Sequence, residues 1–139
     1  MIFNINKPVG WTSFDVVKKV RGITGEKKVG HGGTLDPFAE GVLVVGTGKD
    51  TKKLAHLTSS DKSYIFTIKL GSTTNTLDTE GDVVEKKTIP YLNDTRIISV
   101  INEFVGDSLQ KPPMFSAKKI NGKKLYEYAR KNIKVERNP

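Results

Sequence analysis

The start of the chain carries a strand pattern followed by a helix pattern. Its apolar residues predict a short strand from Ile2 to Ile5, which ends before Pro8. Residues 12–24 then follow the 3.6-residue period of a helix, for which Thr12 or Ser13 is a suitable N-cap. The apolar face of this helix consists of Val16, Val17, Val20 and Ile23.

A glycine-rich stretch separates this helix from a short, strongly apolar segment. Residues 30–33, "GHGG", are expected to form a loop. The apolar run that follows predicts a buried strand over residues 42–45. Asp50 is placed to cap a short helix after that strand.

The middle of the chain predicts a hairpin and then a helix. Residues 63–71, "SYIFTIKLG", alternate as a strand does, and residues 79–87 are expected to pair with them after a turn at Gly81. A helix is expected from an Asp94 cap to Gly106. Its apolar residues, expected to face inward, are Ile97, Ile98, Ile101, Phe104 and Val105.

The last part of the chain predicts a strand, a tight turn and a helix. A Pro-Pro loop leads into a strand, "NG" at Asn121–Gly122 turns it, and "KKLYEYARKN" forms the final helix. Strands and helices follow one another irregularly, so we predict one α+β domain over residues 1–139. The closing "IKVERNP" resembles the start of a strand, which favours an edge strand or a piece of a longer protein.

Composition narrows the classes of function. The chain has no cysteine, which excludes disulfides and thiolate metal sites, and His31 and His56 are too few and too far apart for a metal centre. We therefore expect no metal and no cofactor. No signal peptide or membrane-spanning run is visible, so we expect a cytoplasmic protein.

Charge favours a polyanionic partner. The formal net charge is +8, and residues 117–137 hold eight Lys or Arg and only two Glu. Clustered positive charge neutralises phosphates better than scattered charge does. A solvated basic surface without nucleic acid remains the alternative.

Asp36 stands out because a proline follows it and glycines precede it. The residue before a proline is forced into an extended conformation, so Asp36 is held on a stiff backbone. The glycines Gly30, Gly32 and Gly33 would let a partner such as RNA approach closely. A catalytic carboxylate and an ordinary Asp-Pro turn are both consistent with this pattern.

Four segments, taken together, resemble the TruB-type tRNA pseudouridine synthases of the bacterial stand-alone branch. They are "NKPVGWTSFDVV", "VGHGGTLDPFAEGVLVVGTGKDTK", "KSYIFTIKLGSTTNTLDTEGDVV" and "KPPMFSAKKINGKKLYEYARK", and they span nearly the whole chain. The resemblance implies the pseudouridine-synthase fold, a mixed and largely antiparallel sheet flanked by helices and loops. It also implies an isomerase that converts the T-loop uridine at tRNA position 55 to pseudouridine.

The resemblance assigns roles to three residues. Asp36 matches the family's catalytic aspartate, which acts as nucleophile or base in a reaction that needs no metal. Tyr64 would stack on the flipped uridine, although from pattern alone it is a core aromatic of a strand. His31 would lie where the base leaves the stack, or it makes only a local hydrogen bond.

The resemblance also implies which partners the protein binds. The phosphate contacts that we expect are Lys7, Lys62, Lys118 and Lys119, although a solvated charged face explains each of them nearly as well. We expect the T arm of tRNA as partner, no membrane, no obligate protein partner, and a monomer at full length.

The resemblance further implies that an arginine pairs with the catalytic aspartate, from a stretch that would follow Pro139. We therefore expect an N-terminal part of a catalytic domain that is inactive or nearly so alone. A non-catalytic RNA-binding module or tRNA-folding chaperone is the alternative function.

Overall fold

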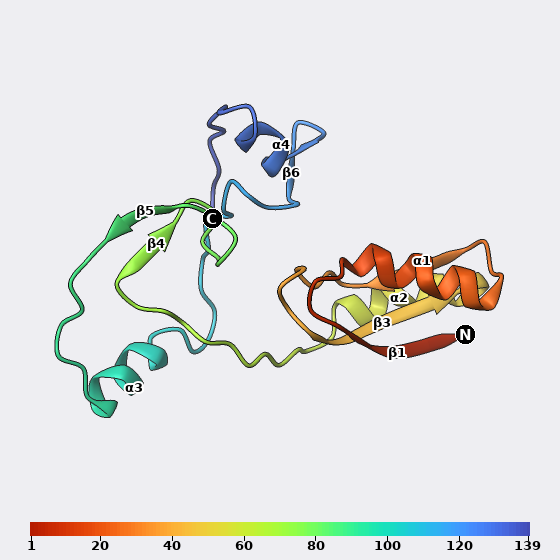
Figure 1. Ribbon diagram of the computed structural model, residues 1–139, viewed down its shortest axis with the longest axis horizontal. Coiled ribbons are helices and arrows are strands. Elements are labelled where there is room, and N and C mark those ends of the chain that lie inside the picture. The colour runs from red at the N-terminus through yellow and green to blue at the C-terminus, as the bar shows by residue number, and fades with distance from the viewer. The chain divides into compact units, whose positions relative to one another are not determined.

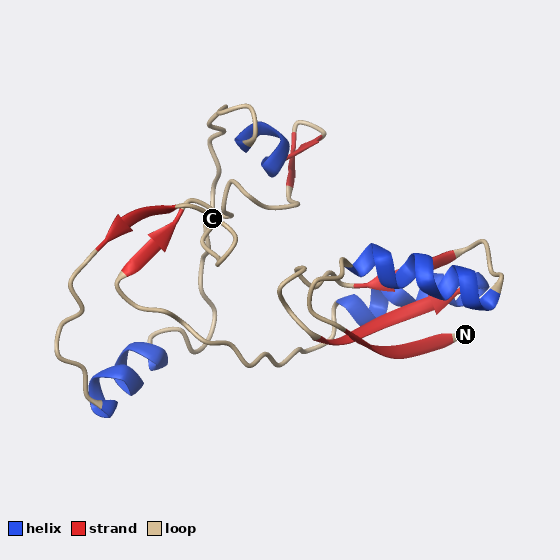
Figure 2. Cartoon of the chain, viewed as in Figure 1, coloured by secondary structure: helices blue, strands red, loops and turns tan.

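The computed structural model describes residues 1–139 and divides into two compact units, Met1–Ile65 and Phe66–Pro139. Each unit combines helices with antiparallel strands, as Figure 1 and Figure 2 show, and this agrees with the predicted α+β class. The expectation of a single domain stays a prediction. None of the helices is long and apolar enough to cross a membrane.

The first unit is built around a three-stranded antiparallel sheet with the strand order β1-β3-β2. Its elements are β1 (Ile2–Lys7), α1 (Ser13–Thr24), β2 (Val29–Gly32), β3 (Gly41–Thr47), the 3-10 helix η1 (Gly48–Lys53) and α2 (Leu54–Thr58). The stretch expected to be a glycine-rich loop is therefore mostly strand β2. Glycines do not prevent a strand here because β3 supplies a full set of backbone partners along β2.

Helix α1 covers one face of this sheet. Cross-strand partners point to the same face, and Phe3 pairs with Val45 while Ile5 pairs with Leu43. The buried core formed with α1 consists of Val16, Val17, Val20, Val29, Leu43 and Val45. Burying each such side chain contributes about 1.5–3 kcal/mol. Ile23 was expected in this core but is 73% exposed, so the apolar contact of α1 ends at Val20.

On the opposite face of the sheet, Leu54 of α2 packs over three glycines, Gly30, Gly32 and Gly46. Gly30 pairs with Gly46, and a Cβ on Gly46 would lie 3.2 Å from Leu54 Cγ. A Cβ on Gly32 would meet Leu54 Cδ2 at 3.4 Å. The sequence hypothesis that these glycines admit RNA is corrected for Gly30 and Gly32, because they admit α2 instead.

Asp50 lies inside η1 rather than at its start. The helix begins at Gly48 after Thr47, which gives no side-chain cap. The Asp50 carboxylate instead pairs with Lys53 Nζ at 2.7 Å and with the Met1 amine at 2.9 Å. The hydrogen bond from Lys53, followed by that from the chain's amino terminus, lowers the pKa of Asp50 to about 2.

The second unit contains two hairpins and two helices. Its elements are β4 (Ser72–Thr74), β5 (Val83–Lys86), α3 (Asp94–Asn102), β6 (Lys119–Ile120), β7 (Lys123–Lys124) and α4 (Leu125–Ala129). The strand predicted over residues 63–71 is wrong: the strand begins at Ser72, which pairs with Lys86. No strand pairs with residues 63–70, and a strand without backbone partners does not form.

Helix α3 differs from its prediction at both ends. Its N-cap is Asn93, whose side chain accepts a hydrogen bond from Arg96 N at 2.9 Å, and not Asp94. The helix ends at Asn102, short of Gly106. Its expected inward face is exposed, as Ile101 at 59% illustrates.

The turn between β6 and β7 is confirmed. Asn121 and Gly122 have φ of 51° and 78°, and two successive positive φ values are those of a type I′ hairpin turn. Helix α4 follows, with Leu125 fully buried and the Tyr128 hydroxyl donating to the Ile120 carbonyl at 3.3 Å.

Candidate functional site

Asp36 occupies the first position of a tight turn in the connection between β2 and β3. The Ala39 N–H donates to the Asp36 carbonyl at 3.1 Å, and Pro37 takes the second position, where its fixed φ favours the turn. The Asp36 side chain is exposed, and none of the ion pairs of the structure includes it. The turn is therefore real, and it leaves a free carboxylate at the surface.

The backbone on both sides of Asp36 is tied to the first residue of α1 and to the loop before it. Ser13 Oγ accepts from Leu35 N at 3.0 Å and donates to Leu35 O at 3.2 Å. Gly10 N donates to Pro37 O at 2.7 Å. The Leu35 side chain also packs against the buried core. Asp36 thus projects from a short segment whose two neighbours are fixed.

The start of α1 leaves Ser13 available for this contact because Thr12 is the N-cap. Thr12 Oγ1 accepts from Asp15 N at 3.1 Å, and Asp15 Oδ2 accepts from Thr12 N at 3.0 Å, which is a capping box. The Thr12 hydroxyl also donates to Asp15 Oδ2 at 2.5 Å, and this bond, followed by the one from Thr12 N, lowers the pKa of Asp15. From sequence, Ser13 is only a second candidate cap. The only sequence signal for the role of Ser13 is that two hydroxyl residues, Thr12 and Ser13, stand side by side. A helix needs only one of them as its N-cap, which leaves the other free for a different contact.

His31 lies on β2 opposite Val45 and is half-buried. Its Nδ1 forms a hydrogen bond with the Gly33 carbonyl. A carbonyl only accepts, so Nδ1 carries a proton and donates it, and Nε2 makes no hydrogen bond in the structure. The local hydrogen bond that the sequence left as an alternative is therefore present, and it leaves one ring nitrogen unused.

Tyr64 belongs to no helix or strand and is 65% exposed. The alternative of a core aromatic does not hold in this structure. The structure brings His31 and Asp36 into one strand and its following turn, whereas Tyr64 lies outside that segment.

Lys7 is not placed to contact phosphate, which corrects the sequence prediction. Its side chain is fully buried, and Nζ donates to Pro8 O at 3.0 Å and to Trp11 O at 2.6 Å. The ammonium would have to leave both carbonyls to reach a ligand. Lys7 instead holds the loop between β1 and α1, which also carries Gly10.

The other three candidate lysines are exposed. Lys62 Nζ donates to the Thr58 and Ser60 carbonyls, both at 2.6 Å, beyond the end of α2. Lys118 and Lys119 lie at the β6–β7 hairpin in the second unit. The ammonium groups of Lys118 and Lys119 make no hydrogen bond or ion pair in the structure and are available to an anion, which is what a phosphate contact requires. The Lys62 ammonium would have to release one of its two carbonyls first, but unlike that of Lys7 it does so at an exposed position.

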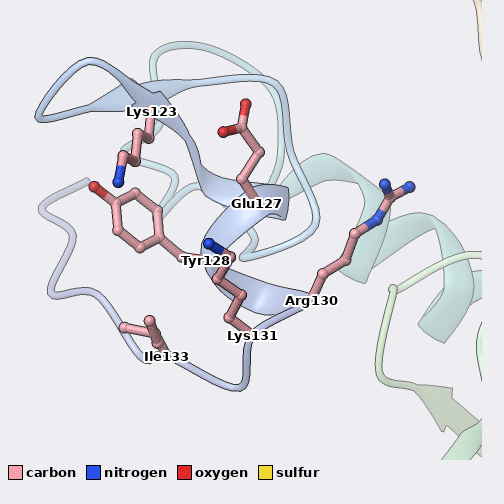
Figure 3. Close-up of a pocket in the computed structure, with 6 residues that line it drawn as sticks. All are labelled: Lys123, Glu127, Tyr128, Arg130, Lys131 and Ile133. Carbon is pink, nitrogen blue, oxygen red and sulfur yellow. The ribbon is translucent and has the colours of Figure 1, made fainter.

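A basic pocket of about 300 Å³ lies beside this hairpin, and Figure 3 shows the side chains around it. It is lined by Lys123, Glu127, Tyr128, Arg130, Lys131 and Ile133. At the C-terminal end of α4, the guanidinium of Arg130 lies 5.2 Å from the centre of the Tyr126 ring, within cation–π range. Positive charge next to aromatic rings suits the phosphates and bases of a polynucleotide.

Several curated proteins similar to this chain share one name. The tRNA pseudouridine synthase B of Dehalococcoides mccartyi is 49% identical over 138 residues, which is 99% of the chain and 46% of that protein. The protein of that name from Clostridium kluyveri is 52% identical over 136 residues, 98% of the chain and 47% of that protein. The chain therefore spans about half the length of the curated relatives it matches.

Two solved structures resemble the fold. A chain of a Cbf5-Nop10-Gar1 complex matches with a TM-score of 0.57 and 29% identity, over 85% of this chain and 30% of that one. A chain of an H/ACA RNP bound to a substrate RNA containing 2′-deoxyuridine matches with a TM-score of 0.51 and 25% identity, over 87% and 34%. These similarities confirm the predicted α+β fold of the pseudouridine-synthase type.

The family comparison covers most of the sequence. The model of the TruB family pseudouridylate synthase N-terminal domain matches residues 21–139, a range that includes His31, Asp36 and Tyr64. The match agrees with the resemblance that the sequence motifs carry. This chain belongs to the TruB family of pseudouridylate synthases and carries its N-terminal domain.

Proposed function

We propose that this chain is the N-terminal part of a tRNA pseudouridine synthase, an isomerase that converts the T-loop uridine at tRNA position 55 to pseudouridine. Family membership and the shared name of the curated relatives support the activity. The observation that carries the proposal is Asp36, an exposed and unpaired carboxylate on a turn fixed at both neighbours.

One positioned carboxylate suits this chemistry. The N1–C1′ bond of the uridine breaks, the base turns, and a C5–C1′ bond forms; C5 loses a proton and N1 gains one. Asp36 serves as the nucleophile or base in this sequence. Hydrolytic glycosidases need a second carboxylate because they activate water. Here the base is kept, and water is not a reactant.

The uridine must leave its stack to reach Asp36. We infer that Tyr64 supplies an aromatic face for the flipped base, and its 65% exposure leaves the ring accessible. His31 is assigned to the place where the base leaves the stack, and its unused Nε2 is a suitable hydrogen-bonding group.

The proposed partner is the T arm of tRNA. Lys62, Lys118 and Lys119 are the proposed backbone contacts, because all three residues are exposed. Lys7 is omitted because it is buried. We propose a cytoplasmic enzyme that is a monomer at full length and needs no protein partner.

The proposal is tested by incubating the product of the complete reading frame with unmodified tRNA and mapping pseudouridine by mass spectrometry. The expected result is conversion at position 55 and nowhere else in the T arm. A tRNA transcript with cytidine at that position is the matched control and should gain no pseudouridine. Tight binding with unchanged uridine would favour a non-catalytic RNA-binding module or chaperone.

A further inference from the structure

Ser13 makes an unusual pair of contacts for a residue in the first turn of a helix. Its hydroxyl both accepts from the N–H and donates to the carbonyl of one residue, Leu35, 22 positions away. The side chain is almost fully buried, with 3% of the residue exposed. The helix does not need this hydroxyl for its cap, because Thr12 and Asp15 form the capping box.

We propose that Ser13 is a positioning residue for the reaction of Asp36, which it orients by fixing both backbone polar groups of the residue before it. This inference rests on the proposed function, in which Asp36 is the reacting carboxylate. Ser13 itself touches no substrate. It acts only through the Leu35 backbone.

The contacts leave Asp36 little freedom. The Leu35 carbonyl belongs to the peptide that joins it to Asp36, so the Ser13 hydroxyl fixes the plane of that peptide. On the other side, Pro37 has a fixed φ and its carbonyl is held by Gly10 N at 2.7 Å. Without the hydroxyl, the Leu35 peptide groups lose their partner and the preceding peptide can rotate.

Such a rotation matters because catalysis requires the reacting atoms in near-contact geometry. A misplacement of about 1 Å costs on the order of 100-fold in rate. Binding of the RNA backbone by exposed lysines elsewhere does not depend on this peptide. Loss of the Ser13 hydroxyl should therefore lower the rate of the chemical step at saturating RNA. The dissociation constant of the RNA complex should stay nearly unchanged.

The test uses Ser13→Ala in the complete reading frame, with Thr12→Ala as the matched control. Thr12→Ala removes the capping box from the same helix end but leaves the contact with Leu35 intact. We expect Ser13→Ala to lower the single-turnover rate by about 10- to 100-fold. Thr12→Ala should stay near the wild-type rate when both variants are assayed well below their melting temperatures.

A second readout follows the backbone of Leu35 directly. Hydrogen exchange of the Leu35 amide should accelerate in Ser13→Ala and stay slow in Thr12→Ala. If Ser13→Ala does not fold, Ser13→Cys replaces it in both measurements, the single-turnover rate and the exchange of the Leu35 amide. A thiol fills the space of the hydroxyl but is a weak donor, so the same losses are expected.

Equal single-turnover rates in the Ser13 and Thr12 variants would overturn the inference. Asp36→Asn separates this failure from failure of the proposed function. An inactive Asp36→Asn beside an unimpaired Ser13 variant refutes only the positioning role. An active Asp36→Asn refutes the function itself.

Discussion

Replacing Lys7 with methionine should destabilise the first unit without changing how RNA binding depends on salt. Methionine keeps most of the apolar stem but removes the ammonium that donates to Pro8 O and Trp11 O. Two carbonyls are then left without a donor, and each unsatisfied buried acceptor costs about 1–3 kcal/mol.

Two effects reduce that sum. Burying the Lys7 ammonium away from water costs free energy in the wild type. Methionine carries no such cost, and this offsets part of the destabilisation. Both hydrogen bonds are also only partly buried, so water can reach the carbonyls. We therefore expect the free energy of unfolding to fall by about 2 kcal/mol, toward the lower end of the range for two unsatisfied acceptors.

The assay combines urea unfolding with RNA binding at several salt concentrations. Lys52→Met is the matched control, since Lys52 is exposed in η1 and should change the unfolding free energy little. A phosphate contact contributes about 0.7–0.9 to the slope of log affinity against log salt. An unchanged unfolding free energy together with a slope reduced by that amount would refute the structural role of Lys7.

Three further changes test other parts of the account. Tyr64→Leu should lower turnover at saturating RNA by about one to two decades, because stacking is worth about 1–3 kcal/mol per base. A rate near wild type would remove Tyr64 from the site. Replacing Lys118 and Lys119 with glutamine should lower the salt slope by about 0.7–0.9 for each phosphate that these lysines neutralise, and an unchanged slope would place them away from RNA. Asp50→Asn should flatten the loss of stability in acid. The pKa of Asp50 is lowered from 3.8 to about 2, so its stabilising effect is complete above pH 3.8 and is lost as the pH falls toward 2. Parallel acid unfolding curves for wild type and variant would contradict this role.

The sequence predicted best where local chemistry decides the structure. The hydroxyl cap of α1 at Thr12, its three buried valines and the Asn-Gly turn were all predicted from nearby residues. The turn at Asp36 was likewise one of two alternatives that the Asp-Pro pair indicated. In each case a few neighbouring residues determine the backbone conformation.

Prediction failed where distant partners decide. Gly30 is part of a strand because β3 pairs with it and Leu54 needs the space above it, and neither fact is visible in "GHGG". Residues 63–70 alternate as a strand should, but nothing in that pattern supplies a partner strand. Lys7 looked like a surface cation because its carbonyl acceptors come from a loop conformation that composition does not reveal.

The candidate site divides in the same way. Its motif residues, Asp36, His31 and Tyr64, were chosen from the sequence, and their roles stay predictions. Ser13 was missed as a contributor because its contact with Leu35 spans 22 positions. A hydroxyl beside an N-cap is common, and only the structure links this one to the Asp36 turn.

The most direct test of the account is single-turnover formation of pseudouridine by Asp36→Asn in the complete reading frame. Glu40→Gln is the control, because Glu40 is an exposed carboxylate in the same connection. The account predicts that Asp36→Asn binds tRNA within a few-fold of wild type and forms no pseudouridine, while Glu40→Gln keeps the wild-type rate. Appreciable pseudouridine from Asp36→Asn would contradict the claim that the Asp36 carboxylate performs the reaction.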